Sequence, residues 1–458
     1  MNSLGFPYLS LAIGSLLFAA LRVPRIQRQR AAAVATCGVA GLLVAGALVE
    51  VEQASGQMRS DPFIPWIGLD PVSGWLMLAL CLMPLFAVCL APRRDVTSGV
   101  VAGCLVLGAA NLLAYGSLSP WTAVLAWWLS ATPFWLGRDA MAGVGRAWTV
   151  PIIGSALLFT LAMVTAGLVG SDSPTLHGGV AVLVLLAVAL RKGLFPFHGW
   201  LAATFEEAPL LWLMLLFNGH LGGLLVLRQG VSNWGWPHWW VDLACGLVIV
   251  SSVVCSLRSL VEANPRRLFA YLFVGQSGLV VGGVLVANAE GLTGAMMHWL
   301  VVVVAASGLI AILRLLETRI SGEDWWRHRQ GLGVGAPRLA TLFLLFALTL
   351  AGLPGTLGYC SQELLFNGAT EHSFYLGLTL TLTSALNAIS VFRIFSTLFL
   401  GVSPKNALRI PDLLPRERWP LAVCIVILLL GGLFPRQVIE MSSSEVALTE
   451  HATPPAAR

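Results

Sequence analysis

Eight ionisable side chains stand in or beside long apolar stretches of this sequence, where one charge can carry chemistry. They are Arg191, Lys192, His198, Glu206, Glu207, His220, His298 and Glu363. A charge in hydrocarbon costs several kcal/mol unless it is paired or hydrated, so such residues are functional candidates by default. Histidine titrates near neutral pH, whereas arginine keeps its charge and carries protons poorly. The set therefore suits the transfer of ions or protons.

Some of these residues also have simpler interpretations. His198 can be a hydrogen-bonded structural histidine, because it stands beside a proline. Arg191 and Lys192 can extend their charged heads to the membrane interface while their stems stay in lipid. These alternatives stay open at the level of the sequence.

The composition indicates what surrounds these residues. Hydrophobic residues make up 57% of the 458 residues and charged residues 11%. A soluble domain carries roughly 25% charged residues, which cover its surface. Most of the surface of this chain must therefore face lipid, and this excludes a soluble secreted protein, a nucleic-acid-binding protein and a cytosolic enzyme.

Apolar stretches long enough to cross a bilayer recur along the whole chain. They are 7–22, 31–50, 72–91, 97–115, 119–136, 149–170, 178–197, 208–228, 240–258, 267–288, 292–316, 339–354, 374–400 and 419–434. Runs of this length are helices rather than barrel strands, because only a helix satisfies its own backbone in lipid. The sequence therefore predicts an all-α polytopic membrane protein with about fourteen transmembrane helices in a single transmembrane domain.

The distribution of basic residues predicts the orientation. With the N-terminus outside, twenty of the 27 Lys and Arg residues fall in cytoplasmic loops and four fall outside. Arg191, Lys192 and Arg393 lie within or beside spans. Such an asymmetry follows the positive-inside rule and places both termini on the outer side. The net charge of +5 is therefore mostly a signal of topology and needs no nucleic-acid partner.

Proline interrupts two spans in comparable places, at Pro196 in the seventh span and at Pro354 in the twelfth. Proline removes an amide donor and clashes with the preceding turn, so each helix should break near the middle of the membrane. Paired broken helices in matching halves are typical of inverted-repeat transporters, whose ion sites lie where exposed backbone faces a cavity. An ordinary kink is the alternative for either site alone.

Several motifs resemble one family of membrane proteins. The stretches are RKGLFPFHGWL at 191–201 with EAP at 207–209, NPRRLFAY at 264–271 with QSG at 276–278, LDPVS at 69–73, GLP at 352–354 with Gly358, and Arg393 with FLG at 399–401. Together they resemble the antiporter-like, proton-conducting membrane subunits of respiratory complex I and of Mrp cation/proton antiporters. Each motif falls in the span where the family carries it.

The resemblance implies an architecture with named parts. It implies leading helices 1–3 at residues 1–96, a first repeat at 97–228, a second repeat at 240–401, and a last helix with a short tail at 402–458. The two repeats, spans 4–8 and 9–13, are inverted five-helix units with broken helices 7 and 12. The resemblance further implies a line of buried ionisable residues and water along the middle of the membrane, through which protons pass.

The sequence departs from the family at several of these positions. Trp128 stands where the family has a glutamate, and Arg191, followed by Lys192, stands where it has a lysine. His220 takes the place of the lysine in span eight, and Ala306 that of the lysine after His298. The Lys-Asp/Glu pair of span twelve reads Gln362-Glu363. A complete proton path cannot be assembled from the eight candidates alone, although water and serines could bridge the gaps.

The leading functional hypothesis is a proton-conducting subunit of a larger energy-coupled complex in the bacterial inner membrane. We expect no catalytic, cofactor or metal site in the chain itself, so any redox chemistry must come from partners. The FHGWL stretch at 197–201 and LGG at 221–223 resemble DabB, the membrane subunit of an inorganic-carbon pump whose partner is a large soluble zinc protein, DabA.

Three alternatives remain open. The first is the membrane arm of an NADH-quinone oxidoreductase or of a hydrogenase-type complex. The second is a scaffold that has lost its proton path, which Trp128, Ala306 and Gln362 favour. The third is an independent secondary transporter of a small solute.

Overall fold

The computed structural model describes residues 3–25, 28–53, 58–69, 71–136, 148–169, 174–209, 212–213, 238–286, 288–320, 326, 331–401 and 411–440. Its helices are α1 (Tyr8–Arg22), α2 (Gln29–Gln53), α3 (Pro71–Leu90), α4 (Ser98–Tyr115), α5 (Pro120–Leu129), α6 (Thr132–Leu136), α7 (Thr149–Val169), α8 (Pro174–Lys192), α9 (Gly199–Glu207), α11 (His238–Val261), α12 (Pro265–Val286), α13 (Ala289–Glu317), α14 (Pro337–Leu350), α15 (Leu357–His372), α16 (Phe374–Phe399) and α17 (Pro415–Leu433). Two short antiparallel strands, β1 (Arg59–Ser60) and β2 (Gly68–Leu69), follow α2. The predicted all-α class is confirmed.

The helices follow the apolar pattern of the sequence closely. Every predicted stretch coincides with a described helix except 208–228, which lies almost wholly outside the described residues. Among those residues, seven helices are long and apolar enough to cross a membrane, and shorter apolar helices accompany them. The count of fourteen spans and the boundaries of the four units stay predictions.

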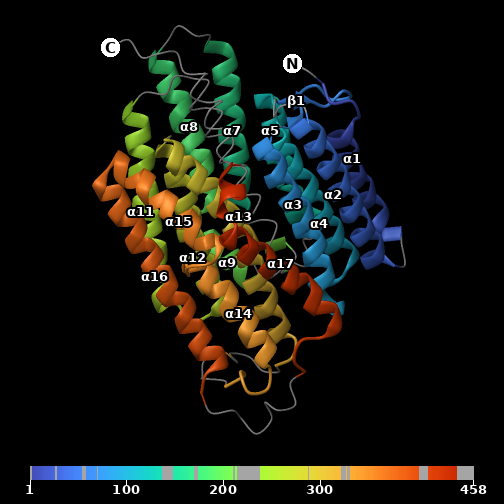
Figure 1. The fold of residues 1–458 in the computed structure, drawn as a ribbon. Coiled ribbons are helices and arrows are strands. Elements are labelled where there is room, and N and C mark those ends of the chain that lie inside the picture. Colours follow the sequence, from blue (N-terminus) through green and yellow to red (C-terminus); the bar gives the residue numbers. More distant parts are fainter. Residues whose placement is uncertain are drawn as a thin grey trace.

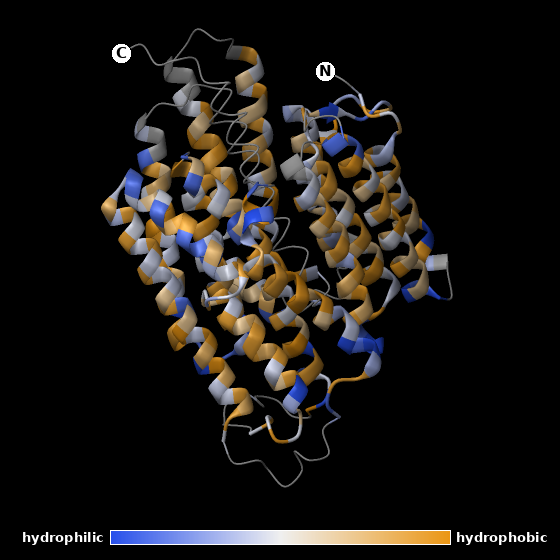
Figure 2. Cartoon of the chain, viewed as in Figure 1, coloured by the Kyte–Doolittle hydropathy of each residue, from blue (hydrophilic) through white to orange (hydrophobic). Residues whose placement is uncertain are grey.

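The helices stand side by side in one bundle (Figure 1). Helices α1 to α4 form one flank, and α11 and α16 form the opposite flank. Apolar residues cover the helices along most of their length, and polar residues gather mainly toward the ends and at a few places between them (Figure 2). This is the distribution expected of a bundle whose middle faces lipid.

Three helices form the centre of the bundle. The most apolar 18-residue stretch of α12 is completely buried. The corresponding stretches of α13 and α4 are 89% and 83% buried. A helix that is hydrophobic on all sides is covered by other helices on all sides. Small residues allow the close contacts: a Cβ on Gly294 of α13 would lie 2.6 Å from the backbone nitrogen of Leu365 in α15. Such contacts fix the positions of the central helices.

Both proline-containing spans are broken, as predicted, and the half-helix before each break ends in the same way. The first lies between α8 and α9, the second between α14 and α15. Each half-helix ends on a glycine with positive φ, Gly193 at 63° and Gly352 at 78°. The amide after each glycine donates to the carbonyl five residues earlier, Leu194 to Ala189 and Leu353 to Leu348, both at 2.9 Å. This is a Schellman stop, which satisfies carbonyls that a helix end leaves free.

The two breaks are inverted relative to each other. Helix α8 descends from the upper end of the bundle, whereas α14 lies at the lower end (Figure 1). A side chain of the following half-helix caps each stop: Trp200 Nε1 donates to the Leu190 carbonyl, and Gln362 Nε2 donates to the Leu350 carbonyl, both at 3.0 Å. The second break thus repeats the first with a different capping residue, which supports the inverted-repeat arrangement.

Ion pairs join several helices at one end of the bundle, which we call the basic end. Arg314 of α13 binds both carboxylate oxygens of Asp95 at 2.7 Å and Glu317 at 2.8 Å. Arg266 of α12 binds both oxygens of Glu317 at 2.7 Å, and its Nη1 donates to the carbonyls of Glu206 and Ala208 at 3.0 and 3.2 Å. Arg266 therefore caps α9 and ties the end of the first broken span to the second half of the chain.

Candidate functional site

Arg191 lies at the end of α8, inside the bundle and only 2% exposed. Its guanidinium donates to the Ser130 hydroxyl and to the Trp127 carbonyl, and its Cζ lies 5.6 Å from the centroid of the Trp127 ring. Among the described residues, a hydroxyl, a carbonyl and an aromatic ring stabilise the charge. Arg191, in the last turn of α8, is therefore held in place by Trp127 of α5 and by Ser130 directly after α5.

Lys192, the last residue of α8, is also only 2% exposed. Its Nζ has no hydrogen-bond partner in the described part of the chain. An interior ammonium group needs an anion or water, because leaving it bare costs several kcal/mol. Lys192 stands directly before the Gly193 stop, where the helix is interrupted. Both Arg191 and Lys192 are thus enclosed by the protein, and neither side chain extends out of the bundle.

His198 lies at the start of α9, on the other side of the first break. It is partly buried, and its ring centroid lies 5.7 Å from Phe195 and 5.9 Å from Tyr271 of α12. Its buried Nδ1 has no hydrogen-bond partner among the described residues. Among the described residues, aromatic contacts thus position the ring of His198.

Glu206 and Glu207 end α9 at the basic end, well separated along the chain from the break. Glu206 accepts from Asn264 at 3.0 Å and lies 3.6 Å from Arg267, whereas Glu207 is exposed. Glu206 lines a cavity of about 800 Å³ together with Glu262, Arg267 and Arg393. Both glutamates also line a second cavity of about 390 Å³. We call the larger one the basic-end cavity.

His298 is fully buried in α13, with a partner for each ring nitrogen. Nε2 lies 2.8 Å from Gln276 Oε1 of α12, and Nδ1 lies 3.1 Å from Ser361 Oγ of α15. Ser361 stands four residues after Leu357, where α15 begins after the second break. A titratable ring in a hydrogen-bonded network is thus placed beside the second break.

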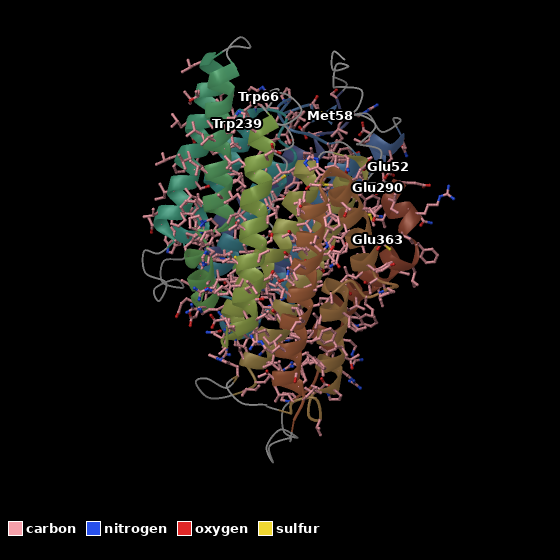
Figure 3. All side chains as sticks on the ribbon, turned by 90° about the vertical axis from the view of Figure 1, so that its left-hand side faces the viewer. Glu52, Met58, Trp66, Trp239, Glu290 and Glu363 are labelled. Carbon is pink, nitrogen blue, oxygen red and sulfur yellow. The ribbon has the colours of Figure 1, made fainter. Side chains whose placement is uncertain are left out.

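Glu363 has a different position from the other candidates. It is exposed on α15, and Figure 3 shows it at the side of the bundle, on the same side as Glu290. Tyr359 and Asn367, one turn before and one turn after Glu363, are also exposed. Glu363 thus belongs to a polar stripe on the outer surface of α15 rather than to the interior.

The residues that replace the family's charged groups have structural contacts. Trp128 donates from Nε1 to Thr160 Oγ1 at 3.0 Å, and Ala306 is buried in α13. Gln362 caps α14, as described above, and its Oε1 accepts from Ser384 of α16 at 3.0 Å. These positions therefore carry neutral groups in the described structure.

The seven candidates that the structure describes do not form one site. Arg191, Lys192 and His198 gather at the first break, His298 lies beside the second, Glu206 and Glu207 line the basic end, and Glu363 faces outward. His220 lies outside the described residues. No group of three or more His, Cys, Asp or Glu residues in the described ranges could hold a metal ion.

The neutral polar partners of these residues were not predicted from the sequence. Gln276 and Ser361 hold His298, and serines of α11 contact Asn387 and Ser390 of α16. The available signal was spacing: these polar residues recur every three or four positions in helices that are otherwise apolar.

Comparison with known proteins identifies the family. The model of the family described as NADH:quinone oxidoreductase/Mrp antiporter, transmembrane, matches residues 144–387, more than half of the chain. The chain belongs to this family. The resemblance that its motifs suggested is confirmed, and the protein is a multi-pass, antiporter-like membrane protein.

Curated relatives of this antiporter-like protein match over part of their length. NADH-quinone oxidoreductase subunit N of Chloroflexus aggregans is 30% identical over 239 residues, 51% of this chain and 48% of the relative. Subunit N of Thermobifida fusca is 29% identical over 308 residues, 63% of this chain and 54% of the relative. The chain thus spans about half the length of these relatives.

Solved structures match the antiporter-like fold over almost the whole chain. A chain of respiratory complex I from Thermus thermophilus gives a TM-score of 0.81 at 20% identity, covering 96% of this chain and 99% of that chain. A chain of the Mrp complex from Dietzia sp. gives 0.82 at 19% identity, with coverage of 97% and 98%. At this level of identity the comparison establishes the fold.

Proposed function

We propose that this protein is the proton-translocating membrane subunit of a multi-subunit complex in a bacterial inner membrane. The observation that carries the proposal is Lys192, a buried cation without a protein partner in the described structure, at the end of a broken helix. Lysine changes its protonation state readily in buried sites, whereas arginine stays charged. A lysine kept inside a membrane protein in this way is suited to accept and release a proton.

The orientation that we propose has the basic end in the cytoplasm and both termini outside. The support is the excess of Lys and Arg in the loops assigned to that end, since positive loops stay on the cytoplasmic side. Glu206, Glu207 and the basic-end cavity would then face the cytoplasm, and His198 and Lys192 would lie deeper along the same broken span.

Flux into liposomes tests the proposal. The full chain is reconstituted, and proton entry under an imposed membrane potential is followed with a pH-sensitive dye. We expect flux above that of protein-free liposomes, with a large loss in Lys192→Met, which keeps much of the side-chain volume and removes the charge. Arg436→Gln is the matched control, because Arg436 pairs with Glu440 on the exposed surface.

Two results would contradict the proposal. Wild-type flux equal to that of empty liposomes would favour the non-conducting scaffold. Equal flux in Lys192→Met and wild type would remove Lys192 from the path. In both cases the thermal unfolding of the purified variants shows whether a change in folding explains the result.

For the coupled reaction we propose uptake of carbon dioxide or bicarbonate beside a DabA-like soluble zinc protein. The support is the FHGWL stretch at 197–201, which begins at the first break and continues into α9. The second candidate is the membrane arm of an NADH-quinone oxidoreductase, which the names of the curated relatives favour. Purification in mild detergent distinguishes them, because a zinc protein co-purifies in the first case and redox subunits in the second.

A further inference from the structure

Three arginines surround a cavity at the basic end of the α1–α4 flank, where α2 begins. Arg28 directly precedes α2, Arg30 lies in its first turn, and Arg93 begins the turn Arg93–Asp95 that follows α3. All three line a cavity of about 620 Å³, which we call the α2 cavity. Figure 2 shows hydrophilic residues gathered at this end of the flank. The α2 cavity shares no described lining residue with the two cavities of the basic end that Glu206 lines.

The positive charge in the α2 cavity is not neutralised by a neighbouring acid. Asp95, the acidic residue nearest to Arg93 in the sequence, binds Arg314 through both carboxylate oxygens at 2.7 Å. Among the described residues, no carboxylate forms an ion pair with Arg28, Arg30 or Arg93. The cavity therefore has the electrostatic character of an anion site.

Arg30 is held in this position against repulsion from other arginines. The positive charges of Arg416, at the start of α17, and of Arg93 both act on it. Arg416 itself lies 3.8 Å from Glu417. Arg30 Nη2 donates to the Ala91 carbonyl at 2.5 Å, which ties the start of α2 to the end of α3. Because like charges at short range repel each other, an anion between these arginines would stabilise the arrangement.

The α2 cavity lies at the level where lipid headgroups meet the hydrocarbon. Helix α2 is one of the helices long and apolar enough to cross a membrane, and it begins at Gln29. The arginines at its start are therefore placed at the boundary of the hydrocarbon core. The cavity also has an apolar wall, formed by Ala31, Val34 and Val96. A charged and an apolar wall in one cavity suit an amphipathic ligand.

A strip of small residues leads from the α2 cavity along α2 into the membrane. Ala35 and Gly38 follow Ala31 at intervals of four and three residues, so they lie on the same face of the helix. Ala35 is exposed, and a Cβ on Gly38 would meet no other described atom within 4 Å. Gly38 lies roughly 12 Å along the axis from Arg30, within the depth of about 15 Å of one hydrocarbon leaflet. The strip thus leaves room for a hydrocarbon chain against α2.

We propose that the α2 cavity binds an anionic phospholipid, with its phosphate on the three arginines and one acyl chain along the strip of small residues. The phosphate oxygens accept hydrogen bonds from guanidinium groups, which match phosphate in geometry and charge. Basic pockets between transmembrane helices on the cytoplasmic side suit anionic headgroups. A free phosphate ion would use the arginines but would gain nothing from the apolar wall. The inference goes beyond the proposed function and does not depend on proton translocation.

Lipid titration of the purified full chain tests the site. The chain is delipidated in a neutral detergent and titrated with phosphatidylglycerol or phosphatidylcholine of the same acyl chains, and bound lipid is counted by native mass spectrometry. We expect one phosphatidylglycerol to bind at least about tenfold more tightly than phosphatidylcholine, whose headgroup has no net charge. An excess of inorganic phosphate should leave the bound lipid in place.

Two arginines can be changed without loss of a described contact. Arg28 and Arg93 are exposed, and among the described residues their side chains make no hydrogen bond or ion pair, whereas Arg30 holds Ala91. We expect Arg93→Gln to weaken phosphatidylglycerol binding about fivefold, the equivalent of about 1 kcal/mol for one arginine near an anionic lipid surface. Arg28→Gln combined with Arg93→Gln should weaken it about 25-fold, because separate charges contribute about additively.

Arg418→Gln is the matched control. It removes the same charge from an exposed residue in the first turn of α17, two positions after Arg416 and therefore on another side of that helix. The affinity for phosphatidylglycerol should stay that of wild type. Thermal unfolding of each variant before lipid is added shows that the protein still folds.

Three results would overturn the proposal. The first is an equal affinity of the wild type for the two lipids, and the second is an unchanged affinity for phosphatidylglycerol in the double variant. The third is displacement of the lipid by inorganic phosphate, which would show that the cavity takes a free anion. Since none of these measurements uses proton flux, they stand or fall separately from the test of the proposed function.

Discussion

At His298, two neighbours determine which protons the ring can hold. The oxygen of Gln276 only accepts, so Nε2 of His298 carries a hydrogen toward it. Ser361 has one hydroxyl hydrogen and two acceptors, the Gly358 carbonyl at 2.8 Å and His298 Nδ1 at 3.1 Å. When the Ser361 hydroxyl donates to the Gly358 carbonyl, its oxygen can accept a hydrogen bond from Nδ1 of a doubly protonated ring. When the hydroxyl instead donates to Nδ1, the ring is neutral. Rotation of one hydroxyl therefore accommodates both states.

His298→Gln should lower proton flux strongly while the protein stays folded. Glutamine can hydrogen-bond in the same cavity but cannot gain a proton. His298→Phe should in addition lower stability by about 1–3 kcal/mol, because it leaves Gln276 and Ser361 without their partner. Flux in liposomes and thermal unfolding in detergent measure the two effects separately. Flux in His298→Gln equal to that of wild type would show that the ring does not carry protons.

At the level of the elements, the two broken spans depend on glycine more directly than on proline. Pro196 and Pro354 predicted the breaks correctly, since proline cannot continue a helix. The stop itself is made two or three residues earlier, where Gly193 and Gly352 adopt positive φ and allow the Schellman hydrogen bonds. Only the prolines could be predicted as the points of interruption, because the φ angle of a glycine in an apolar stretch cannot be read from the sequence.

Gly352→Ala and Gly355→Ala form a matched pair that tests the second break. Both glycines have positive φ, at 78° and 88°, so alanine at either position costs about 1–2 kcal/mol. A Cβ on Gly352 would also collide with Gln362 Oε1, whereas a Cβ on Gly355 has open space around it. We expect Gly352→Ala to lower stability further than Gly355→Ala, by about 1–3 kcal/mol, because the Gln362–Ser384 bond is disturbed. Equal melting temperatures would show that Gln362 does not support the break.

At the scale of the whole molecule, the sequence predicted the features that depend on the length of its apolar stretches and on the positions of its charged residues. The all-α class, the family and the paired breaks follow from patterns that are local or repeated. The contacts at Ser256–Asn387 and Ser259–Ser390 join residues 131 apart, and only the packed bundle brings them together. The interior positions of Arg191 and Lys192 likewise depend on which face of α8 turns inward, and the exposure of Glu363 on which face of α15 turns outward.

The polar stripe on the outer surface of α15 indicates a contact with a neighbouring subunit in the membrane. Glu363 lies six residues after the start of α15, about 9 Å from the second break. The hydrocarbon core extends about 15 Å on each side of the midplane, so a helix that starts near the middle carries Glu363 within it. An exposed carboxylate at this depth is costly in lipid. We therefore expect a neighbouring subunit to cover Glu363, Tyr359 and Asn367 with hydrogen-bond donors or a cation.

Replacing Glu363 by lysine should then release the neighbouring subunit, because a second cation at the interface repels the group that faced the carboxylate. The tagged chain is purified from its native membrane in mild detergent, and the co-eluting proteins are quantified for wild type, Glu363→Lys and Glu290→Lys. Glu290 is the matched control: it is also an exposed glutamate on the same side of the bundle, but it lies in the first turn of α13 (Figure 3). We expect Glu363→Lys to lose its partners and Glu290→Lys to keep them. If both variants keep the same partners as wild type, the stripe faces lipid or water instead, and the interface of the complex must lie on another face of the bundle.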